Sequence, residues 1–215
     1  MKFSFCLMML GLTGFAQAQT PSANAAPLRG DRFKPLAYDQ MTPEQKKMAD
    51  LVISGKIQGG TGGPFNVLLR SPALGEAVVR YGEYVRFKTP LPIKLNELAV
   101  LITTRYWTAQ FPWYAHHRAA VQAGLDETII SAIAVGRRPP SMQPDEEAVY
   151  NFCTELLKNG EVSDATFRAA KDKMGEAGVV ELLGIVGYYG TVSMLVNTDR
   201  YPLPDGVAPE LKPLP

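Results

Sequence analysis

The sequence predicts an all-α protein, an orthogonal multi-helix bundle. Apolar residues recur at three- and four-residue spacings over most of the chain, as on the buried face of an amphipathic helix. Residues that begin and end helices separate these segments, and no run alternates convincingly as a half-buried strand does. Seven or eight helices are expected between residues 41 and 200.

The first helices are marked by their capping residues. Thr42-Pro43-Glu44-Gln45 combines an N-cap residue, a proline at the first helical position and a capping-box partner, and Gly55 is a stop signal. A glycine-rich turn lies within 59–72, where the absence of a following Gly-Lys-Ser/Thr argues against a phosphate loop. Ser71-Pro72 then opens a helix that runs to about Phe87.

The later segments follow the same logic. The final one is apolar on most of its circumference, so it must be buried in a core or in a subunit interface. The expected helices are 94–108, 112–123 (opened by Pro112 and closed by Gly124), 127–135 (capped by Asp126 and ended by Gly136), 145–159 (followed by Gly160), 164–174 (capped by Ser163) and 178–198.

The N-terminus reads as an export signal. Lys2 precedes an apolar run too short to span a bilayer comfortably, and Ala16-Gln17-Ala18 fits a signal peptidase site. We expect a signal peptide over 1–18 with cleavage after Ala18, and a periplasmic or secreted protein. An uncleaved membrane anchor is the alternative. Cys6 lies inside the apolar run, which argues against a lipoprotein.

The mature chain divides into an arm, a domain and a tail. Residues 19–40 mix Pro, Ala, Ser and charge without periodicity and suggest a flexible N-terminal arm, 41–200 have the length of one helical domain, and 201–215 form a Pro-rich tail. The 22 basic and 21 acidic residues nearly cancel and are interspersed, so no basic stripe indicates nucleic-acid binding. No further run suggests a membrane span after signal cleavage.

Cysteine chemistry is restricted by number. Removal of the signal peptide leaves Cys153 as the sole cysteine, so neither an intramolecular disulfide nor a two-cysteine redox centre can form within one chain. Cys153 lies in the apolar helical pattern AVYNFCTELL and reads as a small buried hydrophobe.

The candidate site lies in the hairpin from Asn96 to Gly124. It contains Glu97 and the only two histidines, His116 and His117, and histidine can act as acid, base or ligand near neutral pH. Adjacent residues point about 100° apart on a helix, so one histidine should line the site while the other packs or caps. This spacing suits metal poorly, because ligand pairs on a helix prefer an i, i+4 spacing.

Glu97 falls on an otherwise apolar helix face and needs a partner, either Arg105 or His116; a structural ion pair is the alternative to a catalytic one. Cationic and aromatic side chains flank the turn and could line a pocket for a planar anion, although such aromatics are often plain core. They are Arg105, Tyr106, Trp107, Trp113 and Tyr114, with Arg86 as a weaker candidate.

These segments resemble the carboxymuconolactone decarboxylase family, which includes the alkylhydroperoxidase-D-like proteins. The resemblance lies in the hairpin 97–137 (ELAVLITTRYWTAQFPWYAHHRAAVQAGLDETIISAIAVGR), the last helix 179–198 (VVELLGIVGYYGTVSMLVNT) and the upstream segment 63–78 (GPFNVLLRSPALGEAV). It covers about residues 43–198, within the domain expected at 41–200. It implies an all-α fold of the alkylhydroperoxidase-D-like type, which usually assembles as a trimer or hexamer.

The resemblance also directs attention to single positions. In the redox-active branch a glutamate precedes a Cys-x-x-Cys pair and a histidine; these positions fall on Glu97, Ala109, Pro112 and His116. The dithiol is missing, so the chain resembles the cysteine-free branch, and thiol peroxidase activity is not expected. Many cysteine-free relatives carry an acid where Pro112 stands, which leaves the reaction open.

The resemblance implies a cofactor-independent lyase that acts on a small carboxylated lactone or unsaturated acid. His116 would stabilise or protonate an enolate-like species, Glu97 would orient His116, and Arg105 would hold a carboxylate. Tyr106, Trp107, Trp113 and His117 would complete the binding site, with no metal and no cofactor. A non-enzymatic oligomeric binding protein for a small ligand is the main alternative, and a peroxidase-type redox protein is a weaker one.

Overall fold

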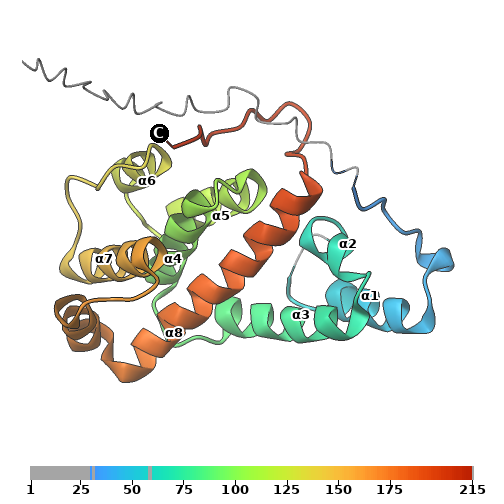
Figure 1. Cartoon of the computed structure of the whole chain (residues 1–215), viewed down its shortest axis with the longest axis horizontal. Coiled ribbons are helices and arrows are strands. Elements are labelled where there is room, and N and C mark those ends of the chain that lie inside the picture. Colours follow the sequence, from blue (N-terminus) through green and yellow to red (C-terminus); the bar gives the residue numbers. More distant parts are fainter. Residues whose placement is uncertain (1–29, 31, 58–59, 215) are drawn as a thin grey trace, which may run out of the picture.

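The computed structural model describes residues 30, 32–57 and 60–214. This part of the chain contains eight α-helices, a short 3-10 helix at Tyr38–Gln40 and no β-strand (Figure 1), which confirms the all-α prediction. The helices are α1 (Pro43–Ser54), α2 (Pro64–Leu68), α3 (Pro72–Phe87), α4 (Ile93–Tyr106), α5 (Gln110–Gln122), α6 (Glu127–Ala134), α7 (Pro144–Asn159) and α8 (Asp164–Asp199).

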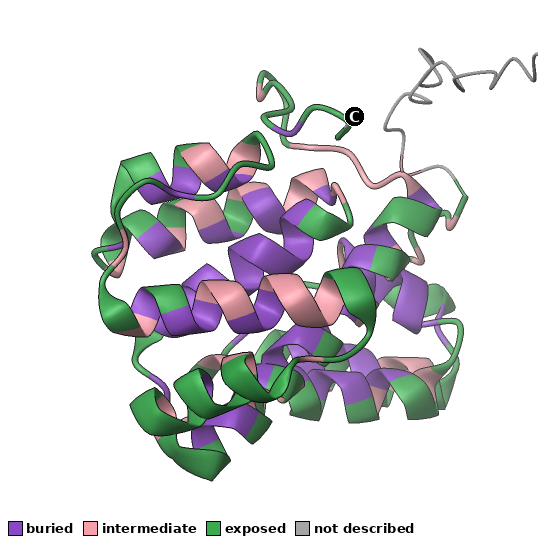
Figure 2. Cartoon of the chain, turned by 60° about the vertical axis from the view of Figure 1, so that its left-hand side comes forward, coloured by how far each residue is buried: buried purple, intermediate pink, exposed green. Residues whose placement is uncertain are grey.

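Helix α4 is the centre of the fold. It packs against α5, α6, α7 and α8, and every residue from Leu95 to Arg105 is buried. Figure 2 shows this concentration of buried residues in the central helices, with exposed residues on the outer faces. Any polar group in this stretch of α4 is therefore removed from water and needs a partner inside the protein.

Helix α8 crosses the molecule diagonally and contacts α2, α3, α4, α5 and α7 (Figure 1). Gly175 breaks it with φ 72° and ψ 175°, a conformation that is accessible to glycine and strained for other residues. The break separates the two helices that the sequence predicts over 164–174 and 178–198. Among the described helices α8 is also the one long and apolar enough to cross a membrane, but 56% of its apolar window is buried, as in a core helix.

The capping signals act locally as the sequence indicates. Thr42 and Gln45 form the reciprocal capping box of α1, with the Gln45 amide donating to Thr42 Oγ1 (3.3 Å) and the Thr42 amide to Gln45 Oε1 (2.9 Å). Several helix ends differ from the prediction by one or two residues, among them the start of α5. Helix α5 begins at Gln110 rather than Pro112, because Thr108 adopts a positive φ of 48° and Ala109 becomes the N-cap.

The described part of the N-terminal arm, residues 30 and 32–40, is held against the domain. The Phe33 amide donates to Asp199 Oδ1 (3.0 Å), and Asn66 Nδ2 donates to the Phe33 carbonyl (2.6 Å). These two bonds join the described part of the arm to α2 and to the end of α8, and the flexibility of the arm stays a prediction. The predicted signal peptide and the start of the arm lie outside the described residues.

The tail, described from 201 to 214, forms no helix and lies across α4 and α5. Leu211 is buried, and its backbone exchanges two hydrogen bonds with the Gln110 side chain (2.6 and 3.2 Å). The tail also makes contact with several residues that the sequence predicts for the site.

Candidate functional site

The centre of the site is a buried pair formed by Glu97 on α4 and His116 on α5. Glu97 is 8% exposed and His116 is 6% exposed, and His116 Nδ1 lies 2.6 Å from Glu97 Oε2. Of the two partners that the sequence offers Glu97, the structure selects His116. The contact occupies Nδ1 of the ring, so Nε2 remains for chemistry on the opposite edge.

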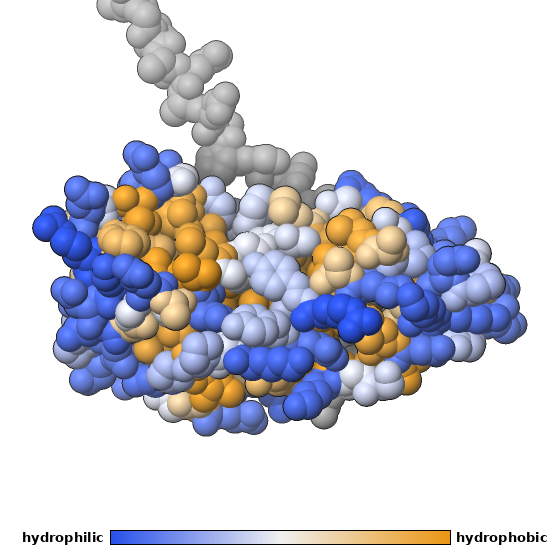
Figure 3. All heavy atoms as spheres, turned by 90° about the horizontal axis from the view of Figure 1, so that it is seen from below, coloured by the Kyte–Doolittle hydropathy of each residue, from blue (hydrophilic) through white to orange (hydrophobic). Residues whose placement is uncertain are grey.

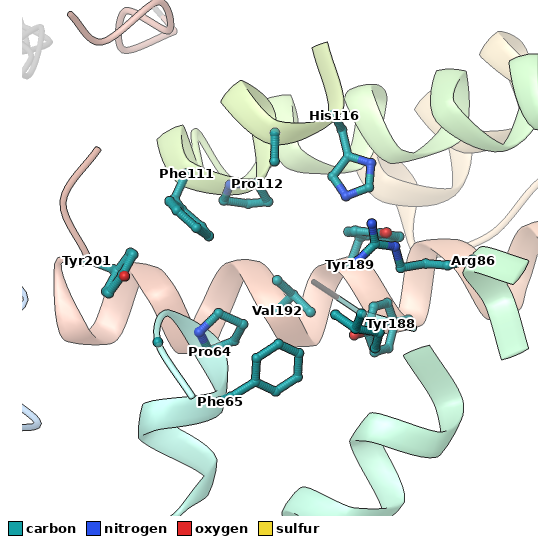
Figure 4. A pocket seen from close by; sticks show the side chains of 13 residues that line it. Pro64, Phe65, Arg86, Phe111, Pro112, His116, Tyr188, Tyr189, Val192 and Tyr201 are labelled. Carbon is teal, nitrogen blue, oxygen red and sulfur yellow. The ribbon is translucent and has the colours of Figure 1, made fainter. Parts of the chain in front are cut away.

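His116 lines a cavity of about 160 Å³ enclosed by α2, α3, α5 and α8 (Figure 4). The walls are mostly apolar and aromatic. The residues that line the cavity are Ile57, Gly62, Pro64, Phe65, Arg86, Phe111, Pro112, Ala115, His116, Tyr188, Tyr189, Val192 and Tyr201. A cavity of this size and character suits a small organic molecule with few polar groups.

Arg86 brings a cation to this cavity from α3. Figure 4 shows its side chain close to His116 and to the two tyrosines of α8. The end of α3 is fixed by Asn96 Nδ2, which donates to the Val85 carbonyl (2.6 Å). No ion pair to Arg86 occurs among the residues described, so its guanidinium is available to an anion.

Tyr188 and Tyr189 complete the polar part of the cavity. The Tyr189 ring meets the His116 ring edge to face, with centroids 4.8 Å apart, and lies 5.0 Å from the Tyr188 ring. Burial raises the pKa of Tyr188 to about 12 and that of Tyr189 well above its usual value of 10.0, although Arg86 opposes both shifts. Both side chains therefore remain neutral O–H donors, and the Tyr189 hydroxyl has no partner among the described groups.

A close packing contact fixes Tyr188. A Cβ at Gly82 would lie 2.2 Å from the Tyr188 hydroxyl, so only glycine leaves room for it. Sequence reasoning missed both tyrosines and named Arg86 only as a weaker candidate. The available signal was two tyrosines next to each other in an otherwise small and aliphatic helix, GYYG.

The remaining predicted binding residues lie elsewhere. Arg105 and Tyr106 line a second cavity, and Trp107 is 36% exposed at the end of α4. Trp113 is fully buried, and its Nε1 donates to Glu210 Oε2 of the tail (2.8 Å). None of these residues lines the His116 cavity, so the structure does not bring them together around a substrate of His116.

His117 turns outward, as the rotation between adjacent helical residues requires. Its Nδ1 lies 2.7 Å from Glu210 Oε2, and its Nε2 lies 3.0 Å from Glu127 Oε1. Burial lowers the pKa of His117, but the hydrogen bonds to Glu210 and Glu127 outweigh that effect and raise it above 6.5. Its placement is that of a clamp between α6 and the tail, outside the His116 cavity.

Cys153 cannot replace the missing dithiol by position or by reactivity. It lies in the core on α7 with no exposed surface, and burial raises the pKa of its thiol to about 12. A thiolate is the reactive form toward peroxides. Pro112 and Ala109, onto which the resemblance places the two cysteines of the redox-active branch, lie in the cavity wall and in the core respectively.

The described residues contain no group of three or more His, Cys, Asp or Glu side chains that could hold a metal ion. What the His116 cavity offers is a histidine held by a buried carboxylate, the cation of Arg86 and the rings of two neutral tyrosines. Such a set can bind an anion and move a proton.

Comparison with known proteins places the fold. No family model matches the chain, and no curated protein matches it in sequence. A crystal structure of a protein of unknown function from Agrobacterium tumefaciens, named as a candidate AhpD antioxidant defence protein, has a similar fold: TM-score 0.58, 20% identity, 66% of this chain and 99% of that chain covered. This likeness supports the AhpD-like helical fold; it does not distinguish the carboxymuconolactone decarboxylase branch within it.

Proposed function

We propose that this protein is a cofactor-independent lyase of AhpD-like fold that acts on a small carboxylated lactone or a related unsaturated acid. One observation carries the proposal. His116, backed by the buried carboxylate of Glu97 at 2.6 Å, faces a small and largely apolar cavity that Arg86 also lines. Removing such a polar pair from water costs free energy. A buried pair of this kind that opens on a cavity is typical of an acid–base centre.

The proposed reaction needs little beyond these groups. Loss of carbon dioxide breaks one carbon–carbon bond and leaves its electron pair on the substrate as an enolate-like species. His116 would deliver a proton to the carbon, and the ring would regain a proton from water, so that one proton is consumed per turnover. Glu97 orients His116 and stabilises its charged form.

Arg86 takes the role that the sequence analysis gave to Arg105. The structure places Arg86 in the His116 cavity and Arg105 in another one, so Arg86 is the cation that would hold a substrate carboxylate. The rings of Tyr188 and Tyr189 would cover the apolar body of the substrate.

A binding protein without turnover is the second candidate. Pro112 forms part of the cavity wall at the position where cysteine-free relatives carry an acid, so a catalytic group of those relatives is absent here. A peroxidase role depends on Cys153, whose burial opposes it.

The deciding experiment is a turnover screen of small lactone acids and peroxides on the purified protein beside His116→Ala and Cys153→Ser variants. Turnover of a lactone acid that requires His116 and not Cys153 supports the lyase. Tight binding of the same acids without conversion supports the binding protein instead. Peroxide consumption that requires Cys153 supports the peroxidase and contradicts the lyase.

Two further parts of the proposal concern assembly and location. Exposed apolar side chains gather on the outer faces of α3 and α8, where a second copy could pack, and Figure 3 shows apolar patches on one such face of the molecule. The exposed apolar side chains on these two helices include Tyr81, Tyr84, Phe87, Val180, Leu183 and Met194. A trimer or hexamer stays a prediction for light scattering to check, and export to the periplasm stays one for fractionation of cells.

A further inference from the structure

A second cavity, of about 220 Å³, lies between α4, α6 and α7. Its walls are formed by Ile102, Ile133 and Leu157, with the rings of Tyr106 and Tyr150 beside them. No residue lines both this cavity and the one at His116. The two are therefore separate cavities, lined by different residues.

All the charged side chains that line this cavity are cationic. Arg105, Arg137 and Lys158 line it, and no Asp or Glu does. None of the three forms an ion pair with any carboxylate among the described residues. Arg137 and Lys158 are exposed at the rim, whereas Arg105 lies inside.

Arg105 is the decisive residue because it is buried and incompletely paired. It is only 4% exposed, and its Nε has no hydrogen-bond partner among the described groups. Its Nη2 donates to the Lys212 carbonyl (2.7 Å), which is neutral, and its Nη1 contact to Thr108 Oγ1 is long at 3.5 Å. A buried cation without a counter-charge is costly, and an anion in the cavity would relieve that cost.

We propose that this cavity is a binding site for a small carboxylate with a flat apolar body, held through Arg105. The carboxylate would accept hydrogen bonds from the guanidinium, while the apolar body would lie among the aliphatic walls and the two tyrosine rings. The site is independent of the chemistry at His116, and its occupant is a ligand that is not turned over there.

The tail closes this cavity. Leu214 lines it and lies against Gly136, where an added Cβ would be 2.3 Å from Leu214 Cδ2. Leu214 is also 41% exposed, so it can leave without uncovering core. A ligand would therefore compete with Leu214 for the same space, and removing that side chain should favour binding.

The test uses benzoate as the probe and benzamide as its uncharged control of the same shape, titrated calorimetrically into the purified full chain. Benzoate should bind at one site. Benzamide should bind at least about tenfold more weakly, because a neutral amide accepts weaker hydrogen bonds from the guanidinium than a charged carboxylate does. Arg105→Gln should weaken benzoate by about tenfold or more. Leu214→Ala should tighten it several-fold.

Arg86→Gln is the matched control, because Arg86 serves the His116 cavity. Benzoate affinity within about twofold of wild type in Arg86→Gln supports the second site, and loss of binding in that variant places benzoate at His116 and overturns it. Equal affinities for benzoate and benzamide would also overturn it. Should Arg105→Gln fail to fold, the nuclear magnetic resonance signal of Arg105 Nε in the wild-type protein decides: it should shift with benzoate and not with benzamide.

Discussion

His116 and His117 are neighbours in the chain, and each lies within hydrogen-bond distance of a carboxylate, yet their surroundings differ in every other respect. His116 is buried, has Glu97 as its single carboxylate partner and opens on an apolar cavity. His117 is partly exposed and bridges Glu127 and Glu210, which are themselves exposed. The helix turns about 100° per residue, and that turn separates a proposed acid–base group from a structural clamp.

The comparison teaches that the carboxylate partner alone does not define a catalytic histidine. What separates the two is the space beside the ring: His116 has a cavity on its free edge, whereas both nitrogens of His117 are occupied by protein carboxylates. A group with both nitrogens engaged has no edge left to offer a substrate.

The largest expected effect is at His116. His116→Ala should lower turnover of a lactone acid by about 10²- to 10⁴-fold, the usual contribution of a general acid or base. His117→Ala should change it far less, because its side chain does not reach the cavity. The measurement is kcat for both variants under one set of conditions, with circular dichroism to establish that each is folded. Equal losses in the two variants would break the distinction between the histidines.

A smaller effect is expected at Glu97. Glu97→Gln keeps a hydrogen-bond acceptor for His116 but removes the charge that stabilises its protonated form, so kcat should fall by about 10- to 100-fold with the fold retained. The split between kcat and KM adds a readout: loss of proton delivery should lower kcat and leave KM within about twofold. A kcat unchanged within about twofold would show that Glu97 acts only as an ion-pair partner in the core.

Much of the helical framework could be predicted from the sequence because its signals are local. The capping box of Thr42 and the breaks at Gly160 and Gly175 each act within one turn of chain, so the sequence carries them directly. The start of α5 could not be predicted, because Pro112 is an ordinary first residue of a helix and the positive φ at Thr108 leaves no mark in the sequence.

The site was predictable only in part, for a different reason. Glu97 and His116 lie on consecutive helices, and a lone acid on an apolar face must find a partner, so a short-range argument leaves Arg105 and His116 as candidates; the structure selects His116. Arg86, Tyr188 and Tyr189 come from α3 and α8, which meet the hairpin only through tertiary packing. Arg105 and Trp113 stand beside the turn in the sequence, but in the structure each donates a hydrogen bond to the tail, whose path is set by contacts across about 100 residues.

At His117, on the outer side of α5, the expected effect is on the free energy of unfolding, and it depends on pH. The folded-state pKa of His117 is raised above its usual 6.5, so the stabilisation from its carboxylate partners is complete below that value. It is lost as the pH rises through the folded-state pKa. Wild type should therefore exceed His117→Gln in free energy of unfolding by more at about pH 6 than at about pH 9.

Urea denaturation at the two pH values measures this difference, and Glu210→Gln is the matched variant, since it removes one charge of the same clamp while leaving an acceptor for Trp113. Both variants should show the same sign of pH dependence. A gap between wild type and His117→Gln that widens toward alkaline pH would contradict the clamp and return His117 to consideration as a site residue.

The smallest effect is expected at Cys153, which lies on α7 in the core, away from both histidines. Its thiol is fully buried and its pKa is raised to about 12, so it is neutral at any pH at which the protein is handled. Cys153→Ala should change turnover by less than about twofold and should not alter peroxide consumption. In the native protein the thiol should react with a disulfide reagent only as fast as the chain unfolds, which a comparison with unfolding rates in urea can establish. Rapid labelling under native conditions would mean that α7 opens, and the case against a thiol-based reaction would then lose its physical basis.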